Sequence, residues 1–196
     1  MSVIHVRSAG QNDQQTVIDV ITLAFSTDPI TRFAFPDPST YLTAMPALAR
    51  AFGGNGFAHG AAHLVDGGPG AAMWLPPGVQ PDADTMAALM ERHVPKDRVD
   101  DMMQVMTQME QYHPAEDCWY LPLIGVDPSC QSRGYGSALL RHALPRCDRD
   151  GVAAYLESSN PRNISLYERH GFEKLGSIQA GASPTMVPML RRPSRP

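Results

Sequence analysis

The chain of 196 residues lacks several features that mark other classes of protein. Its three cysteines (Cys118, Cys130 and Cys147) show no Cys-x-x-Cys spacing, which excludes a zinc-binding knuckle and a disulfide framework. No apolar run is long enough to cross a bilayer, and the first residues lack the basic-then-apolar layout of a secretory signal. We therefore expect a cytoplasmic protein with reduced cysteines and no membrane partner.

Extreme composition is also absent. Hydrophobic residues make up 43% of the chain, charged residues 18%, and the net charge is −4. These values exclude disorder, and the length predicts one domain over residues 1–196, taking ~150 residues per domain as a guide. No basic stripe of the kind that nucleic-acid binding needs is present.

The charge is unevenly distributed along the chain. Residues 82–117 carry a net charge of −6, whereas residues 128–196 carry +5. Such a division favours two different ligands, one cationic and one anionic, although solvated helix faces would give the same pattern.

Hydrophobic periodicity predicts an alternation of helices and strands. Before residue 117 we expect a strand near Ile4, a helix capped by Asn12 or Asp13, and a second helix capped by Ser39 or Thr40. Strands at 57–65 and 71–75 should follow, and then helices over 84–92 and 99–109. Residues 28–29 and 35–38 read as loop. Methionines line one side of the 99–109 helix, where they either fill the core or form a binding groove. Two histidines, His59 and His63, fall in the 57–65 strand without a metal-ligand cluster.

The second half shows a clearer pattern. It predicts strands at 118–126, 152–157, 172–178 and 185–191, a helix after Gly136, and another from Asn160 to His170. Three prolines should distort these elements: Pro122 indicates a bulge in its strand, Pro145 a kink in its helix, and Pro188 an edge strand or a bulge. The fold class is therefore α/β with a mixed sheet.

The segment after residue 126 has the features of an anion site. A buried strand leads into a glycine-bearing loop, and a helix then begins with its backbone N–H groups unpaired at Gly134, Tyr135, Gly136 and Ser137. Arg133 supplies countercharge. No lysine follows Gly136 and Leu139 replaces a third glycine, so neither the P-loop nor the dinucleotide fingerprint fits. A tight loop entering a helix remains an alternative.

Two motifs together carry a resemblance. Gln131-x-x-Gly134-x-Gly136 follows IGVDP, and Asn160-x-x-Asn163-x-x-x-Tyr167-Glu168-x-x-Gly171-Phe172 comes some 20 residues later. In this order and spacing they resemble the GNAT superfamily of N-acetyltransferases over residues 117–178. The strings CWYLPLIGV, MWLPPG and LYERHGF are similar to the puromycin N-acetyltransferase-like branch.

The resemblance implies a mostly antiparallel sheet of six to seven strands, flanked by helices, with strands 118–126 and 152–157 splayed into a V. It implies that residues 1–116 build the acceptor wall and residues 117–178 bind acetyl-CoA. The cofactor-binding residues that it implies are Ile124, Gly125, Val126, Gln131, Ser132, Arg133, Gly134, Tyr135, Gly136, Ser137, Asn160 and Asn163.

The resemblance also assigns roles in catalysis. Tyr167 would protonate the departing thiolate, unless it is simply a core aromatic. Glu157 is the first candidate for the general base, with a helix-capping or ion-paired carboxylate as the alternative. Tyr120, His113 and Glu116 are weaker candidates, and Trp74, Trp119 and Tyr120 are expected to line the acceptor pocket.

The expected activity is acetyl transfer from acetyl-CoA, an acyl-donor co-substrate, to a primary amine of a small molecule. No cysteine is placed by the motifs as a nucleophile, so direct attack in a ternary complex is expected, without a metal. A transferase for protein or peptide amines, or a non-catalytic acyl-CoA-binding module, remains an alternative. The protein would act as a monomer or a homodimer.

Overall fold

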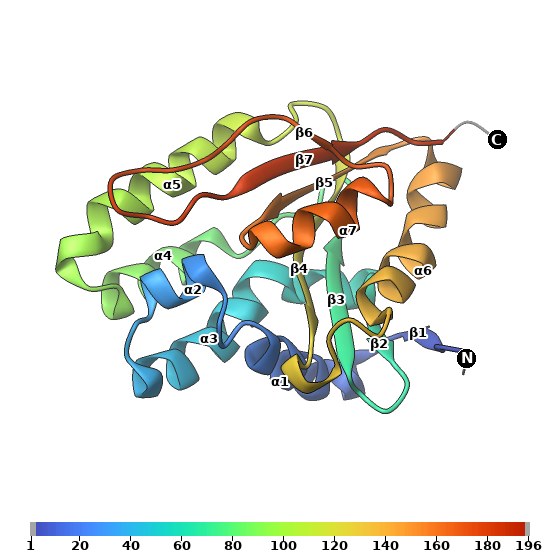
Figure 1. Cartoon of the computed structure of the whole chain (residues 1–196), viewed down its shortest axis with the longest axis horizontal. Helices are drawn as coiled ribbons and strands as arrows, with labels where there is room; N and C mark the ends of the chain where they lie inside the picture. Colours follow the sequence, from blue (N-terminus) through green and yellow to red (C-terminus); the bar gives the residue numbers. More distant parts are fainter. Residues whose placement is uncertain (1–2, 195–196) are drawn as a thin grey trace.

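The fold is built on one mixed sheet, described here from a computed structural model for residues 3–194. Figure 1 shows the sheet, whose strand order is β1-β2-β3-β4-β5-β7-β6. The strands are β1 (Val6–Ser8), β2 (Ala62–Val65), β3 (Gly70–Leu75), β4 (Cys118–Val126), β5 (Ala153–Ser158), β6 (Glu173–Lys174) and β7 (Val187–Arg191). Only the β4–β5 pair is parallel among these described strands. The prediction of a mostly antiparallel sheet of six to seven strands is confirmed.

Helices cover both faces of the sheet. They are α1 (Gln14–Ala24), α2 (Pro29–Ala34), α3 (Pro38–Gly53), α4 (Ala83–His93), α5 (Val99–Tyr112), α6 (Tyr135–Asp150) and α7 (Ile164–Glu168). One face packs against α1 and α3 through a core that includes Ile21 and Met45, and the other packs against α6 through a core that includes Trp74 and Leu139. Over residues 3–194, no helix combines the length and apolar character needed to span a bilayer.

The strands β4 and β5 separate partway along their length. Their parallel ladder joins residues 118–120 to residues 153–155 and extends no further, whereas β5 stays paired with β7 as far as Ser158. On its other side β4 stays paired with β3, but the register shifts between Tyr120 and Leu123. Pro122 lies in this interval, so the bulge predicted from it is confirmed. The result is the predicted V-shaped opening between β4 and β5.

Several predictions for the first half were wrong. Residues 29–34, of which Pro29 was predicted as loop and the others had no predicted element, form α2, whose first turn is capped by the Asp28 side chain. The helix α3 begins at Pro38 and is capped by Asp37, because Asp37 accepts a hydrogen bond from the Thr40 N–H at 2.8 Å. The predicted strand at 57–65 is a 3-10 helix (Gly54–His59) followed by the shorter β2.

The C-terminal elements are also shorter than predicted. The helix expected after Asn160 divides into a 3-10 turn (Pro161–Asn163) and α7. The strand β6 has two residues. Because of β6, the strand β7 is not at the edge of the sheet, contrary to the prediction from Pro188. The Pro188 carbonyl accepts a hydrogen bond from the Leu175 N–H, and the nitrogen of a strand residue points to the same side as its carbonyl. The Pro188 nitrogen therefore faces Leu175, just beyond β6, where no ladder hydrogen bond is needed and proline is tolerated.

The contact between β4 and α1 generates a stability prediction. A Cβ atom at Gly125 would lie 2.5 Å from the Ala24 Cβ, so Gly125→Ala should force β4 and α1 apart. We expect it to destabilise the fold by about 1–3 kcal/mol and to lower the melting temperature by roughly 2–12 °C. Gly10→Ala is the control, because a Cβ there has no neighbour within 4 Å. Equal melting temperatures for the two variants would contradict this packing.

Candidate functional site

A cavity of about 1470 Å³ opens where β4 and β5 separate. Residues from both halves of the chain line it, from α1 to α5 on one side and from β4, β5, α7 and the loop before α6 on the other. Most of the predicted site residues meet in this cavity: Tyr120, Ile124, Gly125, Val126, Gln131, Ser132, Gly134, Tyr135, Gly136, Ser137, Glu157, Asn160, Asn163 and Tyr167. The structure thus brings together side chains that lie far apart in the sequence.

The loop before α6 presents free backbone donors to the cavity. Gly134 has a φ of 87°, and no side chain caps the first turn of α6. Ser132 has a φ of 61°, the left-handed region that residues other than glycine rarely adopt. The N–H groups that begin α6 therefore point outward together, and the helix dipole adds to their attraction for an anion. These residues fit the pyrophosphate of an acyl-CoA.

The side chains around this loop also have defined positions. The Ser137 Oγ lies 2.7 Å from the His170 Nε2 and accepts a hydrogen bond from Arg141 at 2.8 Å. A Cβ at Gly136 would lie 3.1 Å from the Leu166 side chain, so the glycine lets α7 pack closely against α6. Arg133 belongs to the same loop but is exposed and does not line the cavity.

The backbone of β4 beyond Tyr120 has no ladder partner on the β5 side. Ile124, Gly125 and Val126 line the cavity along this stretch. Backbone N–H and C=O groups need partners when they leave water. An extended chain containing amides, such as pantetheine, could supply those partners as an added strand.

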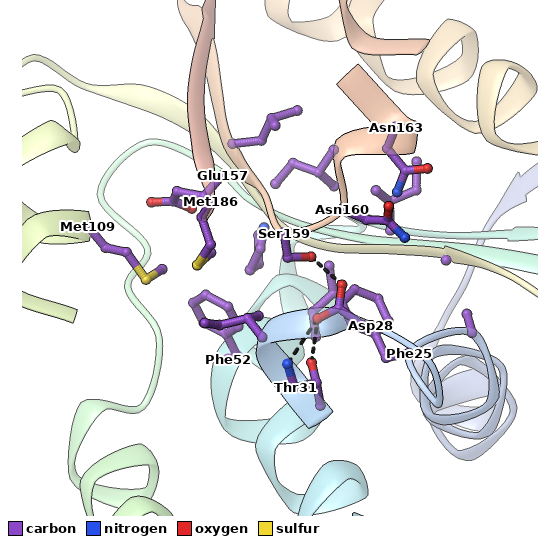
Figure 2. Close-up of a pocket in the computed structure, with 18 of the residues that line it drawn as sticks. Phe25, Asp28, Thr31, Phe52, Met109, Glu157, Ser159, Asn160, Asn163 and Met186 are labelled. Carbon is purple, nitrogen blue, oxygen red and sulfur yellow. Dashed lines mark hydrogen bonds between the residues drawn. The ribbon is translucent and has the colours of Figure 1, made fainter. Parts of the chain in front are cut away.

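Glu157 lies near the end of β5, on the other side of the opening. The Tyr120 hydroxyl donates to its Oε2 at 2.8 Å. Burial raises the pKa of Glu157 to about 7, and the hydrogen bond from Tyr120 opposes that rise only in part. Figure 2 shows its carboxyl group on the side of the cavity where Met109 and Met186 lie. A carboxyl group with a pKa near neutrality can accept a proton at physiological pH.

His113 and Tyr120 pack beside this carboxyl group. Their rings are edge to face with centroids 5.0 Å apart, and both residues line the cavity. Burial lowers the pKa of His113 and raises that of Tyr120 well above its usual range. Glu116, the remaining candidate for the base, is exposed and does not line the cavity. Glu157 is therefore the best placed of the four.

A buried carboxylate that the sequence analysis missed lies at the centre of the cavity. Asp28 Oδ1 accepts from the Thr31 N–H at 3.0 Å and from the Thr31 hydroxyl at 2.9 Å, while Oδ2 accepts from the Ser159 hydroxyl. Figure 2 shows this link between Glu157 on one side and Asn160 and Asn163 on the other. The Asp-Pro pair could have been identified as a helix cap, but its contact with Ser159 has no signal in the sequence.

Tyr167 and the two asparagines lie on the α7 side of the cavity. Tyr167 is 5% exposed and packs against Phe172, with ring centroids 6.0 Å apart. Burial, and to a smaller extent Asp28, raises the pKa of Tyr167 above its usual range, so the phenol stays protonated. The Asn160 side-chain oxygen accepts from the Arg162 N–H at 3.1 Å, which leaves its amide group for a ligand.

Trp74 and Trp119 do not line the cavity, contrary to the prediction. Both side chains lie in the core beneath α6, on the other face of the sheet, and the Trp119 Nε1 donates to Asp150 at 3.0 Å. Adjacent residues of a strand point to opposite faces, so Tyr120 reaches the cavity and Trp119 cannot. The charge of the acidic 82–117 segment favoured a site for a cationic ligand. Among the acidic residues of this segment, however, only Glu110 lines the cavity.

Among residues 3–194, no cluster of three or more histidine, cysteine or acidic side chains is arranged to hold a metal ion.

Comparisons with known proteins agree with this geometry. Residues 102–172 match the model of the Acetyltransferase (GNAT) family. An uncharacterized N-acetyltransferase from Schizosaccharomyces pombe is 37% identical over 78 residues, which cover 38% of this chain and 32% of that protein. The [ribosomal protein bS18]-alanine N-acetyltransferase of Escherichia coli is 42% identical over 65 residues, 32% of this chain and 43% of that enzyme. The chain thus spans less than half of the length of these two relatives.

Solved structures match over nearly the whole chain. A Corynebacterium glutamicum structure titled histone acetyltransferase HPA2 and related acetyltransferase superposes with a TM-score of 0.72 and 25% identity, covering 100% of this chain and 99% of that one. A Drosophila melanogaster polyamine N-acetyltransferase gives 0.68 at 12% identity, covering 97% and 100%, and shows the fold alone. The family model and the structural neighbours together support a GNAT superfamily acetyltransferase.

Proposed function

We propose that this protein transfers the acetyl group of acetyl-CoA to the primary amine of a small molecule. One observation carries the proposal: a single cavity joins the free N–H groups at the start of α6, the unpaired edge of β4, and the carboxyl group of Glu157. These three features fit an anionic donor, its thioester arm and a cationic acceptor, in that order. Residues 1–116 and 117–178 would act as one domain. The strings CWYLPLIGV, MWLPPG and LYERHGF favour the puromycin N-acetyltransferase-like branch of the family.

The proposed donor lies along the loop before α6 and the edge of β4. Residues 131–137 hold the pyrophosphate, while Asn160 and Asn163 bind the amides of the arm. A backbone N–H near Ile124 or Val126 polarises the thioester carbonyl and stabilises the oxyanion of the tetrahedral intermediate. The acetyl group then lies between β4 and β5.

The proposed reaction is a direct displacement. The ammonium of the acceptor gives a proton to Glu157, directly or through water, and the free amine attacks the thioester carbon. A C–N bond forms and the C–S bond breaks, so the products are the acetylated amine and CoA. The departing thiolate takes a proton from Tyr167, and the nitrogen of the intermediate, cationic after the attack, returns its second proton to the Tyr167 oxygen through water. The proton held by Glu157 leaves to solvent. No covalent intermediate with the enzyme is needed.

Binding of the donor can be measured as a thermal shift. Acetyl-CoA at about 100 times its dissociation constant should stabilise the fold by about 2.7 kcal/mol and raise the melting temperature by several degrees, whereas ATP should not. Ser137→Glu should abolish the shift, because it places a carboxylate at the N-terminal turn of α6. Ser165→Glu is the matched control, since Ser165 is exposed and outside the cavity. A folded protein with no acetyl-CoA shift would remove the donor from the proposal.

Tyr167→Phe tests the proton donor. We expect this variant to lower kcat by about a hundredfold, the lower end for loss of a general acid, because the thiolate must then leave without a proton. The acetyl-CoA thermal shift should stay nearly intact, because the ring and its contact with Phe172 remain. Thiol release and the thermal shift together measure both effects. Unchanged turnover would remove Tyr167 from the mechanism.

Glu157→Gln tests the base. Because the pKa of Glu157 is about 7, its carboxyl group is protonated and inactive at lower pH and becomes a base as the pH rises through that value. With an amine whose own pKa lies far higher, kcat/KM should increase with an apparent pKa near 7. Glu157→Gln should lower kcat/KM at pH 8 by about 10²–10³-fold and remove this inflection.

Glu116→Gln is the control for this experiment, because Glu116 is exposed and lies outside the cavity. It should keep the wild-type pH profile. If instead Glu116→Gln removed the inflection and Glu157→Gln kept it, the assignment of the base would be overturned.

A further inference from the structure

The cavity has an apolar compartment on the side of Glu157. Besides Met45 of α3, six methionines from three segments line the cavity: Met86 and Met90 of α4, Met102, Met106 and Met109 of α5, and Met186, which precedes β7. Figure 2 shows Met109 and Met186 on the side of Glu157. We call these six residues the methionine compartment. In Figure 1, α4 and α5 lie at the far end of the molecule from α6. Unbranched thioether side chains adapt to apolar groups of many shapes.

The cavity is too large for one small ligand. Its volume of about 1470 Å³ exceeds the roughly 300–1,000 Å³ of ordinary ligand sites. The donor proposed above accounts for the end next to α6. The methionine compartment therefore belongs to the acceptor.

Charge is scarce in this part of the cavity. Among the described residues that line the cavity, the arginines are Arg162 and Arg169, both on the α7 side, and there is no lysine. Glu110 is exposed at the rim, and both carboxylate oxygens of Asp28 already accept hydrogen bonds from Thr31 and Ser159. Glu157 is thus the carboxylate that remains to bind one cation in the interior.

We propose that the acceptor is a monoamine with an apolar body, an alkylamine or arylalkylamine, whose nitrogen binds at Glu157 and whose body fills the methionine compartment. This inference rests on the proposed function and specifies its substrate class. An amine with a second cationic group at the far end of its body would place that charge among buried thioethers, because Glu110, the carboxylate beside them on α5, is exposed to solvent. Burying an unpaired charge is strongly unfavourable, so polyamines and polycationic amines are rejected.

The first test is a substrate series measured by thiol release. The value of kcat/KM should increase about fourfold for each added methylene from butylamine to octylamine, the fold-change expected when each methylene leaves water. Octylamine should exceed 1,8-diaminooctane by roughly a hundredfold or more, although the two molecules have the same chain length. The diamine is therefore the matched control for charge.

The second test changes the compartment itself. Met106→Glu adds a carboxylate to the wall and should raise kcat/KM for 1,8-diaminooctane while lowering it for octylamine. Met103→Glu is the control on the same helix: Met103 is 57% exposed and does not line the cavity, so the ratio of the two substrates should not change.

The outcomes separate this inference from the proposed function. Equal rates for octylamine and the diamine, or no dependence on chain length, would overturn the apolar acceptor and leave amine acetylation standing. A peptide α-amine that exceeds every monoamine would overturn both the apolar and the small-molecule acceptor. If no amine of any class gave thiol release, although the protein still bound acetyl-CoA, the result would indicate the non-catalytic alternative and overturn both proposals.

Discussion

The site depends on one constraint, the end of the β4–β5 ladder at Tyr120. Beyond this residue the two strands diverge, and the β4 backbone faces an opening that no strand fills. A buried backbone group without a partner costs about 1–3 kcal/mol, so the opening must face water or a ligand that pairs with it. The strand β4 then leads into the loop before α6, and β5 continues to Glu157. The same divergence therefore places the loop before α6 and the carboxyl group of Glu157 in one cavity.

A second interaction joins the two halves of the chain across that cavity. Asp28, at the start of α2, accepts a hydrogen bond from Ser159 in the turn between β5 and α7. Because Thr31 occupies the other carboxylate oxygen, Asp28 is buried with its charge balanced by hydrogen bonds. In Figure 2 this link lies between the asparagines and Glu157. The start of α6 and Glu157 therefore lie in one cavity that this hydrogen-bonded link spans.

The strands, most helices and the glycine-bearing loop before α6 were predictable because they depend on local pattern. The strand β4 is an unbroken apolar run with the bounds predicted, and α6 begins after Gly134 and ends before Gly151. The short α2 lacks the length for a periodic signal. The tryptophans were misplaced because alternation along β4 puts Trp119 and Tyr120 on opposite faces of the sheet, and which face holds the cavity depends on helices far away in the sequence. The Asp28–Ser159 contact spans 131 residues, and no local pattern encodes it.

The chemistry of Glu157 and the composition of the cavity are two consequences of one environment. A carboxyl group is a useful base near neutral pH only if its pKa rises, and here burial supplies the rise. The apolar side chains on its side of the cavity, Met109 and Met186 among them, also form the surface proposed to contact the acceptor. Polar or charged residues there would hydrate Glu157, lower its pKa and admit charged substrates together. In such a site the strength of the base and the selectivity for an apolar amine cannot be changed independently.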